Sequence, residues 1–147
     1  MRIILPYYKY AEGTPGMNRV LAYAKAMGSL GHEVHVIFFF SDSVITNPLK
    51  DCIGVTVHTL SNVESYGNKL FAFVSALIRF SHFLKKKDYV FVYAVSGFLS
   101  IVLSALSKSA HVFCEITEHP DIYKKRRIQI VHYINKNISL CCLRHVD

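Results

Sequence analysis

Apolar segments of strand length alternate with segments of helical spacing along most of this chain. The predicted strands are RIILPYY (2–8), HEVHVIFFF (32–40), GVTVHTL (54–60), YVFVYA (89–94) and HVFCEIT (111–117). Strands that are apolar on both sides are typical of parallel sheets, because the crossover helices cover both faces of such a sheet. The alternation therefore predicts an α/β, Rossmann-like fold: a parallel sheet with helices on both faces, in a single domain over residues 1–147.

Helices are predicted between and after these strands. The first is ended by Gly31, the second covers 66–85, the third 97–106, and a long helix begins near Pro120. The expected apolar faces are Met17, Val20, Leu21, Ala24, Met27 and Leu30 in the first helix, and Leu70, Phe73, Val74, Leu77 and Leu84 in the second. The predicted order is βαββαβαβα, which fits one domain of 147 residues.

The uncharged segment 89–106 is nearly long enough to cross a bilayer. Ser96 and Gly97 interrupt it, its first half is β-branched and aromatic, and its second half carries serines at helical spacing. We interpret it as a buried strand followed by a buried helix, with a membrane span as the alternative.

A formal charge of +7 and a pI near 9.3 favour an anionic partner. The basic runs 85–87 and 124–127 match no RNA-binding, zinc-finger or basic-zipper pattern, so no nucleic acid is expected, and an exposed helix end explains each run. The cysteines, at 52, 114, 141 and 142, form no CxxC pair, and the N-terminus lacks a signal-peptide pattern. We therefore expect reduced thiols and a cytoplasmic protein.

Gly13 and Gly16 lie between the first predicted strand and its helix. In open parallel sheets, ligands bind outside the carboxyl ends of the strands, and a helix N-terminus offers N–H groups to an anion such as phosphate. The loop matches neither GxGxxG nor the GK[ST] of a P-loop, so no nucleotide cofactor is predicted. Turn chemistry is the alternative explanation of the two glycines.

Two separated segments resemble the N-terminal domain of GT-B glycosyltransferases of family 4. The first combines the glycine-bearing loop, Arg19 near the helix start, and the helix-to-strand segment that contains GHEV (31–34). The second is FCEITEHP (113–120), which looks like the E-x-x-[DE]…P segment that many members carry after the fifth strand. The resemblance implies the acceptor-side half of a GT-B fold over nearly the whole chain.

The resemblance also implies a retaining transferase that moves a sugar from a nucleotide-sugar donor to a glycan or lipid-linked acceptor, and we expect it to act in cell-envelope polysaccharide synthesis. In the family the donor binds mainly to a C-terminal domain with an E-x7-E motif, which these 147 residues do not contain. We therefore expect a chain truncated before its donor domain and inactive alone. The alternatives are a non-catalytic binding or membrane-associated module with the same fold and a nicotinamide-dependent enzyme, which the missing GxGxxG disfavours.

The resemblance also suggests site residues. Glu118 and His119 are the catalytic candidates, through a hydrogen bond to a sugar hydroxyl or as the base for the acceptor, and Gly13, Gly16, Arg19 and Glu115 are the substrate-binding candidates. Alternatively, Glu115 and Glu118 cap a helix or pair with a lysine. No metal is expected, because HEVH (32–35) is one residue short of the HExxH zinc motif and the segment is predicted as a strand.

The helix within 69–87, together with the cations of 124–127, is the candidate contact with an anionic membrane surface. Aromatic side chains and lysines would hold the protein against lipid headgroups, with each cation contributing about 1 kcal/mol near the surface. The expected location is therefore cytoplasmic and peripheral, at the inner face of the membrane.

Overall fold

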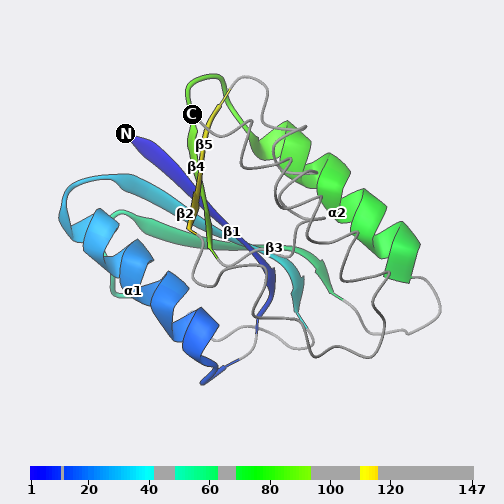
Figure 1. Cartoon of the computed structure of the whole chain (residues 1–147), viewed down its shortest axis with the longest axis horizontal. Helices are drawn as coiled ribbons and strands as arrows, with labels where there is room; N and C mark the ends of the chain where they lie inside the picture. Colours follow the sequence, from blue (N-terminus) through cyan, green and yellow to red (C-terminus); the bar gives the residue numbers. More distant parts are fainter. Residues whose placement is uncertain (11, 42–48, 63–68, 94–109, 116–147) are drawn as a thin grey trace, which may run out of the picture.

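The structure is a computed structural model that describes residues 1–10, 12–41, 49–62, 69–93 and 110–115 (Figure 1). In chain order the elements are β1 (Arg2–Lys9), α1 (Pro15–Ser29), β2 (Glu33–Ser41), β3 (Val55–Asn62), α2 (Lys69–Phe83), β4 (Tyr89–Tyr93) and β5 (His111–Glu115). The five predicted strands and the first two predicted helices are thus present. The helices predicted over 97–106 and after Pro120 lie outside the described residues.

The strands form one parallel sheet in the order β3-β2-β1-β4-β5. From the central β1 the chain moves outward to β2 and β3, and then crosses back through α2 to β4 on the other side of β1. The direction of winding therefore reverses between β1 and β4. In doubly wound sheets, the crevice at the carboxyl ends of the two strands at this reversal is where ligands bind.

The two described helices cover opposite faces of the sheet, as Figure 1 shows. Successive side chains of a strand point to opposite faces, so one strand serves both cores. On one face Ile3, Leu5, Val34, Val36 and Phe38 pack with Met17, Val20 and Ala24 of α1. On the other face Ile4, Ile37, Phe39, Val90 and Val92 pack with Ala76 and Phe80 of α2. The expected Rossmann-like sheet with helices on both faces is confirmed for this part of the chain.

Two predicted core positions are wrong. Leu30 follows the last residue of α1 and is 74% exposed, because the helix ends at Ser29 rather than running up to Gly31. Val74 of α2 is 45% exposed, because α2 buries the face that carries Ala76 and Phe80. The sequence of α2 is apolar almost all round, so its periodicity did not determine which face meets the sheet.

A buried ion pair joins the beginning of β1 to the beginning of β4. The carboxylate of Asp88 is 3% exposed and accepts hydrogen bonds from the Arg2 guanidinium and from the backbone N–H of Lys85. The same guanidinium lies 4.7 Å from the ring centre of Phe83 and donates to the Phe83 carbonyl. These contacts attach the end of α2 and the start of β4 to β1, and so hold together the two strands between which the winding reverses.

The segment 89–106 is described only in its first part, where β4 confirms the predicted strand. Within the described ranges, no helix combines the length and the apolar character needed to cross a membrane. Cys52, the one cysteine whose side chain is described, is not in a disulfide.

Candidate functional site

The β1–α1 loop and the ends of β4 and β5 lie at the same, carboxyl edge of the sheet. β1 ends at Lys9, and residues 10–14 connect it to α1 at this edge. β4 and β5 are parallel to β1 and end at Tyr93 and Glu115, whose backbones are paired with each other. With strands about 4.8 Å apart, β1 and β5 are separated by about 10 Å across the sheet, and β1 extends two residues beyond the level of Glu115. That span suits one small ligand lying across the reversal point.

The N-terminus of α1 faces this edge without a side-chain cap. The N-cap residue Thr14 makes no cap hydrogen bond with its side chain, Pro15 occupies the first turn, and this turn contains no acidic residue. The first backbone hydrogen bond of the helix joins Asn18 N–H to the Thr14 carbonyl at 2.9 Å. The N–H groups of this turn and the positive end of the helix dipole therefore favour an anion.

Gly13 adopts a left-handed backbone conformation, with φ at +74°. Residues with a Cβ rarely adopt this conformation, so the turn itself requires glycine. A Cβ at this position would also meet no atom within 4 Å, which leaves open space beside the loop. The geometry thus supports the turn explanation, and it also leaves room for a ligand to approach the backbone. Gly16 is the second residue of α1 and is half-buried.

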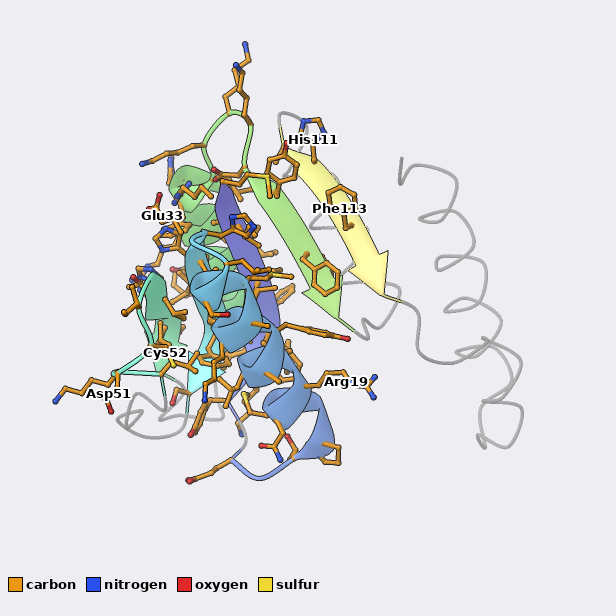
Figure 2. The ribbon with its side chains drawn as sticks, turned by 90° about the vertical axis from the view of Figure 1, so that its left-hand side faces the viewer. Arg19, Glu33, Asp51, Cys52, His111 and Phe113 are labelled. Carbon is orange, nitrogen blue, oxygen red and sulfur yellow. The ribbon has the colours of Figure 1, made fainter. Side chains whose placement is uncertain are left out.

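Arg19 lies on the side of α1 that faces β4. Tyr23, one turn later on the same helix face, packs edge-on against Phe91 of β4 with ring centres 5.5 Å apart. Arg19 is therefore about 5.4 Å nearer the N-terminus of α1, toward the carboxyl end of β4. Figure 2 shows its exposed side chain projecting from α1 toward the side of the view on which β4 and β5 lie.

The remaining predicted site residues are described only in part or not at all. Glu115 is the last residue of β5, so its backbone lies at the same edge as Gly13 and the start of α1. Glu118 and His119 lie outside the described residues, and their roles stay predictions. The structure thus brings Gly13, Gly16, Arg19 and the backbone of Glu115 to one edge of the sheet.

An aromatic residue that the sequence analysis did not single out also lies at this edge. Tyr8, near the end of β1, is 54% exposed, and its ring centre is 5.2 Å from that of Phe40 and 6.5 Å from that of Phe73. An exposed tyrosine offers both an apolar ring and a hydroxyl to a ligand. The available signal was its position as the last residue of the predicted first strand, directly before the loop.

A second polar cluster lies farther from the carboxyl edge, on β2 and β3. Nδ1 of His35 is 3.0 Å from Nε2 of His58, and Nε2 of His35 is 2.9 Å from a carboxylate oxygen of Glu33. The ring of Phe83 packs against both histidines. Only one of the two facing nitrogens can carry the proton that the histidines share. Among the described residues, no group of three or more His, Cys, Asp or Glu is placed to hold a metal ion.

The environment of this cluster lowers the pKa values of His58 and Glu33. Burial lowers the pKa of His58, and the nearby His35 and Arg2 lower it further. The hydrogen bond with His35 lowers the pKa of Glu33, an exposed carboxylate to which Arg2 and Lys85 also contribute favourable charge. A positive charge on His58 is therefore disfavoured in the folded chain.

We expect acidification to destabilise the fold through His58. Because its pKa is lower in the folded than in the unfolded chain, the unfolded chain binds the proton more readily. This contribution to stability is complete above the ordinary histidine pKa of about 6.5, and it is lost as the pH falls from there toward the lowered value. Urea unfolding at about pH 8 and about pH 5.5 measures the loss.

The matched variants are His58→Gln and His82→Gln, the second being an exposed histidine on α2. The loss of stability between the two pH values should shrink in His58→Gln and persist in His82→Gln. The same loss in both variants would contradict the role of His58.

Comparison of the chain with protein-family models, with curated proteins and with solved structures finds no match. The class of the protein therefore follows from its own structure. The described residues form a doubly wound parallel α/β domain with a candidate anion site at the point where the winding reverses. No family membership follows from these comparisons.

Proposed function

We propose that this domain is the acceptor-side half of a retaining glycosyltransferase that uses a nucleotide-sugar donor. The observation that carries the proposal is the position of the α1 N-terminus, Gly13 and Arg19 at the carboxyl edge beside the β1–β4 reversal point. The resemblance of the β1–α1–β2 segment and of 113–120 to family 4 GT-B enzymes gives the reaction class.

In this proposal the domain contributes charge stabilisation and positioning. Transfer from a nucleotide sugar releases a diphosphate, and the backbone amides of 13–16 together with the Arg19 guanidinium would stabilise its negative charge from this side. Glu118 or His119 would take the proton of the acceptor hydroxyl, and Glu115 would contact substrate. A second domain of the E-x7-E type would bind most of the donor.

The proposed acceptor is a glycan or lipid-linked intermediate of cell-envelope polysaccharide synthesis. The proposed location is cytoplasmic, at the inner face of the membrane, and the support for it is the free thiol of Cys52 among the described residues. Neither a cofactor nor a metal takes part in the proposed reaction.

The experiment compares the chain alone with the chain joined to a donor domain. Each form is assayed with a panel of nucleotide sugars and lipid-linked acceptors, and any donor domain encoded beside the chain is supplied in trans or fused. We expect no turnover by the chain alone and turnover by the fused form. Robust turnover by the isolated chain would contradict the assignment of the donor site to a second domain, and no turnover in any form would favour a non-catalytic module.

A further inference from the structure

One face of α2 exposes apolar side chains instead of burying them. Phe71 is 76% exposed, Val74 45% and Ile78 53%. Their spacing of three and four residues places them in one stripe along the helix, and we call these three residues the α2 stripe. The buried contacts of the helix are made by its other face, through Ala76 and Phe80. Packing against the sheet therefore does not account for the α2 stripe.

The surroundings of the stripe are cationic. Residues 69–87 contain Lys69, Arg79 and the run Lys85–Lys87 and no Asp or Glu, and of these cations Arg79 is directed to β3, where it donates to the Leu60 carbonyl. The three lysines of the run are exposed directly after the helix, and His82 is exposed in its last turn. Two acidic groups of the described residues lie near this end: Asp88 is buried against Arg2, and Glu33 is hydrogen-bonded to His35. Both carboxylates are thus engaged with cationic or imidazole partners.

We propose that α2 is a membrane-docking surface that lies flat on an anionic lipid bilayer. A helix with an exposed apolar stripe and flanking cations is suited to the interface plane, where apolar side chains enter the acyl boundary and lysines meet headgroup phosphates. The 15-residue α2 lies on the surface in this proposal and does not cross the bilayer. The charge pattern selects an anionic lipid surface over a second copy of this chain, whose own stripe carries the same cations.

The stripe begins at the edge of the sheet that holds the candidate site. Phe73, near the start of α2, packs against Phe39 and Phe40 toward the end of β2, whereas Phe83, at the end of α2, packs against His35 in its first half. Phe71 therefore lies toward the carboxyl edge and Lys85 toward the opposite edge. A bilayer along the stripe would pass beside the candidate site. This docking proposal stands independently of sugar transfer, and the two are tested separately.

Co-sedimentation of the full chain with lipid vesicles tests the proposal. We expect binding to vesicles of phosphatidylcholine with phosphatidylglycerol, and at least about tenfold weaker binding to phosphatidylcholine alone. Phe71→Ser with Ile78→Ser should lower binding to the anionic vesicles by about tenfold or more. The matched control is Leu30→Ser with Ile53→Ser, because these apolar residues are 74% and 88% exposed but lie away from α2. The control pair should bind as the unchanged chain does.

A second pair of variants tests whether the lysines after α2 contribute to vesicle binding. Lys85→Gln with Lys86→Gln should weaken binding to anionic vesicles by about tenfold, whereas Lys25→Gln with Lys50→Gln, two exposed lysines away from α2, should leave it unchanged. Far-ultraviolet circular dichroism and thermal melting show that each variant is folded before its binding is compared.

Three results would overturn the proposal. The first is equal binding to neutral and anionic vesicles, and the second is an equal loss in the stripe and control variants. The third is a stripe variant that loses self-association in sedimentation velocity while keeping its vesicle binding, because a second copy of the chain would then be the occupant of the stripe. None of these results bears on sugar transfer, which the fused-domain assay measures.

Discussion

Replacing Asp88 by alanine is expected to lower the free energy of unfolding by about 3–5 kcal/mol, the usual cost of removing one partner of a buried ion pair. The variant leaves the Arg2 guanidinium, whose side chain is 13% exposed, without its nearest carboxylate. It also removes the acceptor of the Lys85 N–H. Since domains of this size are stable by about 5–15 kcal/mol, much of the margin would be lost.

Urea unfolding followed by circular dichroism measures the effect of Asp88→Ala. Asp51→Ala is the control, because Asp51 is exposed before β3, as Figure 2 shows, and its replacement should change stability by less than about 0.5 kcal/mol. Asp88→Asn keeps one acceptor oxygen and should lie between the two. If the free energy of unfolding of Asp88→Ala equals that of Asp51→Ala, the ion pair does not hold β4 beside β1.

The second large effect concerns Arg19. In the transfer-competent, two-domain form, Arg19→Gln is expected to lower kcat/KM by about 100-fold, because one donor to a developing negative charge is lost. Lys25→Gln removes an exposed cation from the same helix, about 9 Å farther from the carboxyl edge, and should leave kcat/KM within about twofold. Equal losses in both variants would assign the effect to overall charge instead of to a contact at the site.

The strands were predictable because burial on both faces leaves a local signature. β2 is buried from Val34 to Ser41. Its run of apolar residues predicts this burial from the strand's own sequence, even when the neighbouring strands are not known. The strand order was not predictable in this way. It depends on which side of β1 receives β4, and the Arg2–Asp88 pair that joins these strands links residues 86 positions apart.

The candidate site and the other features of the surface divide in the same manner. Gly13 was predictable, since a glycine in a tight loop points to a special backbone conformation, whereas Arg19 was singled out by the resemblance of its segment to a known family pattern and not by periodicity. The contact between His35 and His58 was not predictable, because the register of β3 on β2 brings these side chains together. The exposure of Val74 was missed because α2 is apolar on several sides.

We expect an anionic group to bind at the carboxyl edge where β1, β4 and the N-terminus of α1 meet. Nuclear magnetic resonance of the isotope-labelled chain, titrated with a nucleoside diphosphate, tests it directly, because each backbone amide reports its own surroundings. Binding at this edge should cause weak, saturable shifts centred on the amides of Gly13, Gly16 and Arg19, with Gly31 and Gly54 unaffected. Shifts centred on Gly31 and Gly54, or no shifts at Gly13 and Gly16 at the highest ligand concentration, would contradict it.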